Sequence, residues 1–185
     1  LPISHVARSL YLNRVFFVTD VLGTQSVANA VLKHIDRIER FIHISTSEVY
    51  GSALYEPMDE GHSLNPTTPY AAAKAGADRL VHSYVVSYDI PGVIVRPFNN
   101  YGPSQHLEKV IPRFITCALL GEPLTIHGDG TAERDWIFVE DTVEAVDKAV
   151  HAPIDKVRGE VFNAGSGVSI SILKIAEMIC DIFGL

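Results

Sequence analysis

Cysteine is scarce in this sequence: the 185 residues include only Cys117 and Cys180. Both lie inside apolar helical patterns, where a cysteine usually acts as a small buried hydrophobic residue. No cysteine and histidine spacing typical of a metal site occurs, and two cysteines do not make a disulfide framework. The sequence therefore predicts no metal site and favours a reducing, cytoplasmic setting.

Long apolar runs and an excess of basic residues are also lacking. No apolar run approaches the roughly 20 residues that cross a bilayer. The chain opens with neither a signal peptide nor a Met, so we expect it to begin inside a longer protein. Its net charge of −7 argues against a nucleic-acid surface, which needs a basic stripe to release counterions. We expect no membrane segment and no nucleic-acid partner.

The sequence also lacks a complete glycine-rich loop for a dinucleotide pyrophosphate. Gly165-Ser166-Gly167 resembles the start of one, because it follows a predicted strand and precedes a predicted helix. Ile170 stands where the third glycine belongs, and too few residues follow for the acidic ribose partner about 20 positions on. We interpret this stretch as a turn beside a ligand site.

Strand and helix patterns alternate along the chain. Apolar residues at helical spacing predict helices over 20–36, 70–88, 109–120, 141–150 and 169–183. Short apolar runs predict strands at 41–45, 93–96, 124–127, 136–139 and 161–163, with a loop over 51–69. Continuous apolar strands between helices are typical of a parallel sheet covered on both faces, so the fold class is α/β with a doubly wound sheet.

Tyr70 and Lys74 stand four residues apart at the start of a predicted helix and therefore share one of its faces. A phenol with a pKa near 10 is a poor base at neutral pH, but a neighbouring ammonium favours the phenolate. Such a pair can take a proton from a secondary alcohol while a nicotinamide takes the hydride. Alone, the spacing is a weak motif and favours an exposed Tyr/Lys pair on a helix.

Three polar residues, Thr46, Ser47 and Glu48, directly follow a predicted buried strand. Ligands of open α/β sheets bind at this carboxyl end of the strands. The Thr46 hydroxyl is a natural partner for the Tyr70 oxygen. Glu48 can remove an acidic C–H proton next to a newly formed ketone, or can simply be a solvated loop acid.

Several spaced motifs in order give the chain a family resemblance. They are Ser45-Thr46-Ser47-Glu48-Val49-Tyr50-Gly51, Pro69-Tyr70-Ala71-Ala72-Ala73-Lys74, Arg96-Pro97-Phe98-Asn99-Asn100-Tyr101-Gly102-Pro103, Glu108-Lys109-Val110-Ile111-Pro112, and His127-Gly128-Asp129-Gly130 followed by Arg134-Asp135-Trp136. Over nearly its whole length the chain resembles the extended short-chain dehydrogenase/reductases, NAD-dependent nucleotide-sugar epimerases and dehydratases, and most of all the 4,6-dehydratases.

This resemblance implies a Rossmann-like fold whose first strands and glycine-rich loop precede Leu1. It implies an NAD-binding domain with the catalytic residues at 1–103. A smaller nucleotide-sugar-binding subdomain would occupy 104–185, with some elements returning to the sheet. Tyr70, Lys74 and Thr46 would oxidise the sugar C4 hydroxyl with NAD⁺, and Glu48 would abstract the C5 proton. Water would leave from C6 and the hydride would return there, giving a 4-keto-6-deoxy sugar nucleotide of the kind used in polysaccharide biosynthesis.

Ser47 departs from part of that family, because the dTDP-glucose enzymes usually carry an acidic Asp there. GDP-mannose dehydratases and uronate decarboxylases carry Ser. We therefore keep open a 4-epimerase or a decarboxylase with the same Tyr/Lys/Thr core. A non-catalytic fragment that only binds nucleotide sugar is a further alternative. If the reaction is dehydration, Glu48 would serve as both base and acid, with Ser47 relaying or positioning.

The remaining expected contacts also follow from the resemblance. Ser45, Tyr70, Lys74, Pro97 and Asn99 would bind the cofactor. The nucleotide sugar would meet Asn99, Lys109, Val110, Arg113, His127, Arg134 and Asn163. Arg134 would pair with the diphosphate, a task suited to a planar fork of donors, although an ion pair with Glu133 or Asp135 is the simpler alternative. The family commonly forms homodimers, here through the Tyr70 helix and the 20–36 helix.

Overall fold

The structure is a computed structural model and describes residues 4–185. Contacts between backbone segments divide it into two units, each formed by separate stretches of the chain. The first unit runs to Pro97 and takes up the chain again over Val143–Ala164, and the second comprises Phe98–Thr142 and Gly165–Leu185. We expected a boundary near residue 103, with some later elements returning to the sheet. The chain passes between the units three times, because the strand that completes the first unit's sheet comes late in the sequence.

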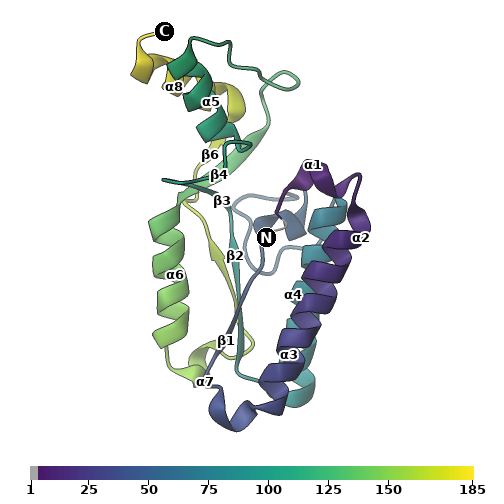
Figure 1. The fold of residues 1–185 in the computed structure, drawn as a ribbon. Helices are drawn as coiled ribbons and strands as arrows, with labels where there is room; N and C mark the ends of the chain where they lie inside the picture. Colours follow the sequence, from purple (N-terminus) through teal and green to yellow (C-terminus); the bar gives the residue numbers. More distant parts are fainter. Residues whose placement is uncertain (1–3) are drawn as a thin grey trace. The chain divides into compact units, whose positions relative to one another are not determined.

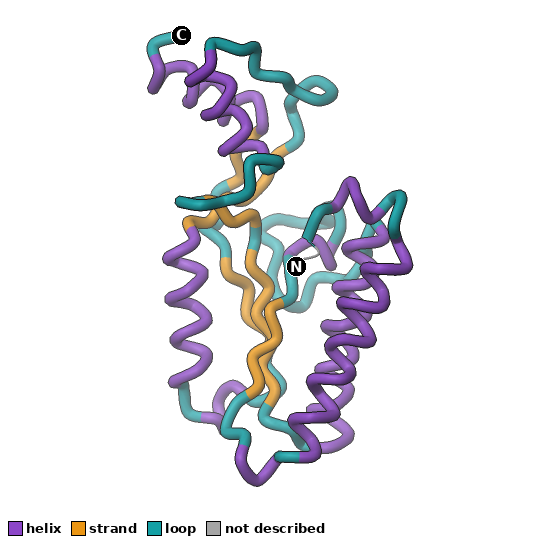
Figure 2. Tube along the Cα trace, viewed as in Figure 1, coloured by secondary structure: helices purple, strands orange, loops and turns teal. Residues whose placement is uncertain are grey.

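A three-stranded parallel sheet forms the centre of the first unit (Figures 1 and 2). The strands are β1 (Phe41–Ile44), β2 (Gly92–Pro97) and β5 (Val161–Ala164), in the order β1-β2-β5. β2 is central and buried along its whole length, as its continuous apolar run predicts. The α/β class with a parallel, Rossmann-like sheet is therefore confirmed.

Helices cover both faces of this sheet (Figure 1). α3 (Gly23–Lys33) and α4 (Pro69–Tyr88) run side by side on one face, and α6 (Val139–His151) supplies its Val143–His151 part to the other. Arg40 fixes that part of α6 beside β1 by donating hydrogen bonds to the carbonyl oxygens of Ala149 and Ala152, at 2.9 and 2.7 Å. The short helices of the unit are α1 (Val6–Ser9), α2 (Asn13–Phe16), η1 (Phe17–Leu22), η2 (Ile35–Arg37), η3 (Ser47–Tyr50) and α7 (Ile154–Val157).

The second unit combines short strands with two amphipathic helices. β3 (Asn99–Tyr101) pairs in parallel with β4 (Glu133–Phe138), and β4 pairs antiparallel with β6 (Ser169–Ser171). Helices α5 (Val110–Leu120) and α8 (Ile172–Phe183) pack together around an apolar cluster. The buried members of that cluster are Phe114, Ala118, Ile175, Ala176 and Ile179.

Two predicted elements of the second unit were wrong in type or extent. The strand predicted over 124–127 is not a strand, because Leu124 and Ile126 use their apolar side chains to pack against the α5/α8 cluster instead of joining a ladder. The last helix begins at Ile172 rather than at Ser169. The preceding residues pair with β4 as β6, and the Ser171 hydroxyl caps the helix by accepting from the Lys174 N–H at 3.1 Å.

The helix predicted over 20–36 begins earlier, since α2, η1 and α3 form one continuous helical stretch, Asn13–Lys33. By length and composition alone this stretch could cross a membrane, which is weak evidence because core helices of soluble proteins pass the same test. Its polar side chains pair within the unit: Tyr84 of α4 donates to the Asn29 side-chain oxygen at 2.7 Å. The absence of a membrane segment stays a prediction.

Candidate active site

The carboxyl end of β1 leads directly into the first part of the site. Thr46 is extended, and its hydroxyl accepts from the Glu48 N–H at 3.2 Å, which caps the short helix η3. Ser47 is buried, while Glu48 is half-buried. Gly51 ends η3 with φ +71°, and a Cβ there would lie 2.0 Å from the Asn65 carbonyl oxygen, so only glycine fits. The turn thus fixes all three polar residues at the strand end.

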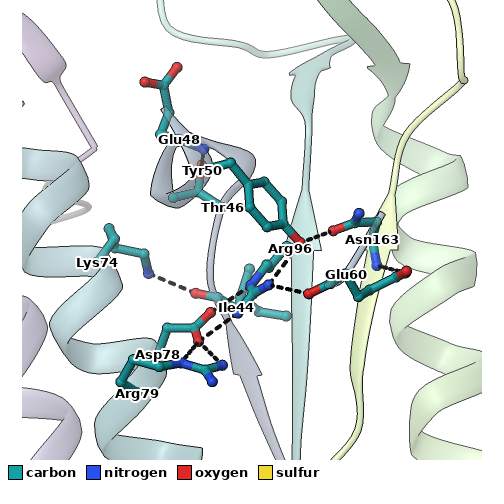
Figure 3. A network of polar contacts seen from close by, with 10 residues as sticks. All are labelled: Ile44, Thr46, Glu48, Tyr50, Glu60, Lys74, Asp78, Arg79, Arg96 and Asn163. Carbon is teal, nitrogen blue, oxygen red and sulfur yellow. Dashed lines mark hydrogen bonds and ion pairs between the residues drawn. The ribbon is translucent and has the colours of Figure 1, made fainter. Parts of the chain in front are cut away.

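The first two turns of α4 carry the second part of the site. Thr68 caps this helix by accepting from the Ala71 N–H at 3.1 Å, and Pro69 occupies its first turn. Tyr70 is 8% exposed, and its ring meets Phe16 edge-on at 6.1 Å. Lys74 reaches back to the sheet and donates to the Ile44 carbonyl oxygen at 2.7 Å (Figure 3). The structure therefore brings all five predicted catalytic residues, with Ser45, to the end of β1.

The electrostatics of Tyr70 differ from the expectation. The pKa of Tyr70 is raised to about 12, chiefly by burial and less by the charges of Asp20 and Glu48, while the neighbouring Thr46 hydroxyl acts to lower it. The expected lowering of this pKa by Lys74 was therefore wrong for the chain alone. The lysine ammonium donates to the Ile44 carbonyl. Burial lowers the pKa of Lys74 itself, while Asp20 and Asp78 raise it.

A buried ionic network lies behind these residues (Figure 3). Arg96 of β2 is 2% exposed and grips the Asp78 carboxylate of α4 through two hydrogen bonds of 2.9 Å. It also donates to the Tyr50 hydroxyl at 2.7 Å. Burial alone would raise the pKa of Asp78, but the hydrogen bonds and charge of Arg96, with hydrogen bonds from Arg79, lower it to about 2. This network joins η3, α4 and the central strand.

Asn163, predicted to contact a phosphate, has structural partners at the other end of this network. Its side-chain oxygen accepts from the Tyr50 hydroxyl at 2.8 Å, and its amide donates to the Met58 carbonyl at 3.1 Å. Its backbone N–H donates to the Glu60 carboxylate at 2.8 Å. These contacts fix β5 to the loop before α4 and account for the residue without a ligand. The phosphate contact stays a prediction.

The other predicted substrate-binding residues lie in the second unit. Asn99 pairs opposite Trp136 in β3, Lys109 precedes α5, and Val110 and Arg113 form its first turn. His127 is exposed in the loop before β4, and Arg134 is exposed on that strand. Pro97, predicted to bind the cofactor, is buried at the end of β2 in the first unit.

Asp135 resolves the ambiguity over Arg134. The Asp135 carboxylate accepts from the N–H groups of Ser166 and Gly167, each at 2.8 Å, and so closes the 165–167 turn. Among the described residues, Arg134 donates one hydrogen bond, to the Glu133 backbone carbonyl at 2.7 Å. Arg134 and Asp135 therefore do not form the ion pair that was the alternative to a diphosphate contact.

Sequence reasoning missed two charged groups of the site, Asp20 and Asp78. Asp78 lies eight residues after Tyr70 on the same helix, a spacing that could have drawn attention to it. Asp20 interrupts an apolar run between Val15 and Leu22. A single acid in such a run is a signal for a carboxylate that lies close to the packed core.

Comparison with known proteins places this arrangement in a family. Residues 2–165 match the NAD dependent epimerase/dehydratase family. The low-salt glycan biosynthesis protein Agl12 of Haloferax volcanii is 45% identical over 98% of this chain and 57% of its own length. A crystal structure of a double mutant of DesIV, a dTDP-glucose 4,6-dehydratase from Streptomyces venezuelae with NAD and DAU bound, has a TM-score of 0.92 at 34% identity. It is matched over 100% of this chain and 56% of that one.

A 4-epimerase is also among the similar structures. UDP-glucuronic acid 4-epimerase from Bacillus cereus, in complex with UDP-glucuronic acid and NAD, has a TM-score of 0.84 at 37% identity, over 91% of this chain and 52% of that one. The sheet and site thus define an α/β protein of the extended dehydrogenase/reductase type. The chain belongs to the NAD dependent epimerase/dehydratase family. It spans little more than half the length of these relatives.

Proposed function

We propose that this chain carries the catalytic residues of an NAD-dependent nucleoside-diphosphate-sugar 4,6-dehydratase. The observation that carries the proposal is the convergence of Thr46, Glu48, Tyr70 and Lys74 at the end of β1. Hydroxyl, phenol, ammonium and carboxylate are the groups needed to oxidise a sugar alcohol and then abstract a proton beside the ketone. Similarity to a dTDP-glucose 4,6-dehydratase supports the same reaction.

The residues present fit a nicotinamide nucleotide. Tyr70 and Lys74 would hold its ribose and nicotinamide side, and Ser45, Pro97 and Asn99 are the further predicted contacts. The carboxyl end of a parallel strand is where such ligands bind, and the chain's own donors there include the half-buried Lys74 ammonium. When bound, NAD supplies the hydride acceptor and donor of the reaction.

Tyr70 would act as the base that removes the proton of the sugar C4 hydroxyl. With a pKa of about 12 it is protonated in the chain alone, so catalysis requires a further positive charge near its oxygen. A cationic nicotinamide ring and the Lys74 ammonium would both favour the phenolate. The Thr46 hydroxyl, which favours the phenolate of Tyr70, would orient the same sugar hydroxyl.

Glu48 would remove the C5 proton that the C4 ketone acidifies, and the C6 hydroxyl would leave as water. The Ser47 hydroxyl is buried beside Glu48 and would position the leaving group. Because Ser47 cannot be the acid, Glu48 would return its proton to the departing oxygen. Arg113, Arg134 and Lys109 would hold the nucleoside diphosphate.

A 4-epimerase is the second candidate. Ser47 in place of the family's Asp and the similarity to UDP-glucuronic acid 4-epimerase both favour it. It would use Tyr70, Lys74 and Thr46 unchanged and would leave Glu48 without a role in elimination. A uronate decarboxylase with the same core, and a fragment that binds nucleotide sugar without turnover, are the remaining alternatives.

The decisive experiment incubates the protein with NAD⁺ and, separately, with dTDP-glucose, UDP-glucose and GDP-mannose. Mass spectrometry then reads the products. Dehydration removes one water from the sugar nucleotide, whereas epimerisation leaves the mass unchanged and alters the NMR coupling at C4. Decarboxylation is tested in parallel with UDP-glucuronate. An isomer of unchanged mass, or no turnover by a protein that contains NAD, would refute the dehydratase proposal.

The homodimer and the cytoplasmic location stay predictions. The helical stretch before α4 exposes large apolar side chains, among them Val15, Val18 and Leu22. A second copy of the chain would cover these side chains, which supports the proposed dimer. Sedimentation of the purified protein tests the dimer. Substitution of Val18 by Glu should shift it toward monomer if this face is the interface.

A further inference from the structure

Tyr50 is the last residue of η3, the short helix that carries Ser47 and Glu48, and it is fully buried. Its hydroxyl accepts a hydrogen bond from Arg96 Nη1 at 2.7 Å and donates one to the Asn163 side-chain oxygen at 2.8 Å. Figure 3 shows the Tyr50 ring pointing into this network, while the Glu48 carboxylate leaves η3 in another direction. A buried phenol needs one hydrogen-bond partner, and this one has two.

Packing alone does not explain the Tyr50 hydroxyl. The Tyr50 ring belongs to an apolar cluster with Val49 and Ala75, and Met58 and Leu64 pack against that cluster. A phenyl ring without the hydroxyl would fill the same place, and the hydroxyl adds a polar group that has to be satisfied after burial. What the hydroxyl contributes is a fixed position, because both its donor and its acceptor are used.

Arg96 connects Tyr50 to the helix that carries the proposed redox pair. Arg96 is 2% exposed and donates two hydrogen bonds of 2.9 Å to the fully buried Asp78 carboxylate. A guanidinium is a rigid planar fork, so it fixes the Tyr50 hydroxyl relative to this carboxylate. Asp78 stands four residues after Lys74 on α4, and residues at this spacing share one helix face. One guanidinium therefore holds both η3 and the catalytic face of α4.

Asn163 extends the same contact to β5 and to the loop after η3. Its side-chain amide donates to the Met58 carbonyl at 3.1 Å, and its backbone N–H donates to the Glu60 carboxylate at 2.8 Å. The Tyr50 hydroxyl thus bonds a side chain whose other polar groups also have partners. The chain that leaves η3 is fixed to the sheet on this side.

The two proposed catalytic steps depend on η3 to different degrees. Thr46, proposed for the redox step, directly follows Ser45, whose N–H donates to the Val95 carbonyl at 2.7 Å. The sheet therefore fixes Thr46 without help from Tyr50. Glu48 lies two residues farther from the sheet and two residues before Tyr50, so its position depends also on how Tyr50 is held.

We propose that the Tyr50 hydroxyl, held by Arg96, positions Glu48 relative to the catalytic face of α4. Tyr50 is a positioning residue, because it acts on the sugar only through Glu48, and this role rests on the proposed function. Removing the hydroxyl should leave oxidation at C4 nearly unchanged. It should slow elimination across C5 and C6, because a base that is moved out of its reacting geometry loses much of its rate.

The test compares Tyr50→Phe with the parent protein, using NAD⁺ and the sugar nucleotide that the parent accepts. Mass spectrometry gives the ratio of 4-keto sugar that has kept its C6 hydroxyl to dehydrated product, and we expect this ratio to rise on the order of tenfold. A smaller folded fraction would slow both steps equally and leave the ratio unchanged. Tyr55→Phe, which removes an exposed phenol hydroxyl bonded to Asp59 in the next loop, should keep the parental ratio.

Amide hydrogen exchange gives a second readout that needs no substrate. The Gly51 N–H donates to the Glu48 carbonyl at 3.2 Å at the end of η3, and the Ala72 N–H donates to the Thr68 carbonyl at 2.8 Å in α4. Losing the bond from Arg96 should loosen η3 locally, so the Gly51 amide should exchange about tenfold faster in Tyr50→Phe. The Ala72 amide should exchange at the parental rate.

A parental product ratio in folded Tyr50→Phe would overturn the proposal, whatever the exchange rate. Should that variant not fold, Arg96→Lys keeps the positive charge without the planar fork and should raise the ratio in the same way. A parental ratio in Arg96→Lys would then be the contrary result. If the parent protein itself releases no water, the proposed function fails, and the Gly51 amide alone decides whether the hydroxyl holds η3. Unchanged exchange there would show that it does not.

Discussion

The two units of this chain bury different kinds of side chain. Every buried polar or charged residue that the structure describes lies in the first unit: Ser9, His43, Ser45, Ser47, His62, Asp78 and Arg96. The core cluster of the second unit is apolar, and its predicted ligand contacts, such as Arg113 and Arg134, are exposed. Proton chemistry needs groups with fixed positions and perturbed pKa values, whereas binding a charged ligand needs accessible donors. The contrast matches the proposed roles, in which the first unit performs the proton chemistry and the second binds the charged ligand.

Tyr70→Phe should have the largest effect on activity. Removing the phenol oxygen deletes the proposed base and leaves the ring packed against Phe16, so we expect kcat to fall by about 10²–10⁴-fold with the fold intact. Tyr84→Phe is the matched control on the same helix, because the Tyr84 hydroxyl bonds Asn29 and lies outside the proposed site. Equal loss in both variants would show that Tyr70 contributes structure rather than chemistry.

Arg96→Met should have the largest effect on stability. It leaves the buried Asp78 carboxylate without its main partner, and we expect the free energy of unfolding to fall by about 3–5 kcal/mol, measured by urea denaturation. Arg158→Met breaks the exposed pair with Asp89 in the same unit and should cost less than about 1 kcal/mol. Similar losses in the two variants would mean that burial does not determine how much this network contributes to the free energy of unfolding.

Arg134→Ala should test the recognition role of the second unit. An exposed arginine adds little to stability, so the unfolding transition should barely move. If Arg134 pairs with a diphosphate, losing a charge-assisted hydrogen bond of about 1.5–3 kcal/mol should raise KM by about 10–100-fold with little change in kcat. Lys174→Ala on α8, which removes an exposed pair with Glu177, is the control. An unchanged KM would contradict the proposed contact.

Acid should destabilise the first unit through Asp78. Its pKa is held at about 2 in the folded chain, below the unfolded value near 3.8. A depressed carboxylate pKa contributes stability above the unfolded value and loses it as the pH falls toward the folded one. We expect a loss of about 2 kcal/mol between about pH 4 and pH 2. Urea denaturation across this range checks it, and the same slope in Arg96→Met would contradict the assignment.

The sequence allowed much of the first unit to be predicted, for definable reasons. β2 is a continuous apolar run because it is central and buried on both faces. The start of α4 is predictable because Thr68 is a helix-capping residue and Pro69 favours the first turn of a helix. The predicted strand at 124–127 failed because Leu124 and Ile126 pack on helices, and an apolar pair does not reveal whether its partner is a strand or a helix. The return of β5 to the sheet follows from topology rather than from any local pattern.

The candidate site was predictable where residue type and spacing carry the chemistry, as for Tyr70, Lys74 and Thr46. The pKa of Tyr70 was not, because it depends on burial and on the charge of Asp20, which lies 50 residues away in sequence. Asn163 is a different case. A motif position predicts a ligand contact, which stays a prediction, and the fold adds side-chain partners in Tyr50 and Met58 that the sequence does not indicate.

The central claim is that the first unit holds a redox pair and a separate elimination base. Glu48→Gln tests it most directly when the variant, with NAD⁺ and the accepted sugar nucleotide, is followed by absorbance and mass spectrometry. We predict that reduced nicotinamide accumulates with a 4-keto sugar that has kept its C6 hydroxyl, whereas Tyr70→Phe shows neither. Loss of water at the parental rate in Glu48→Gln would contradict this account.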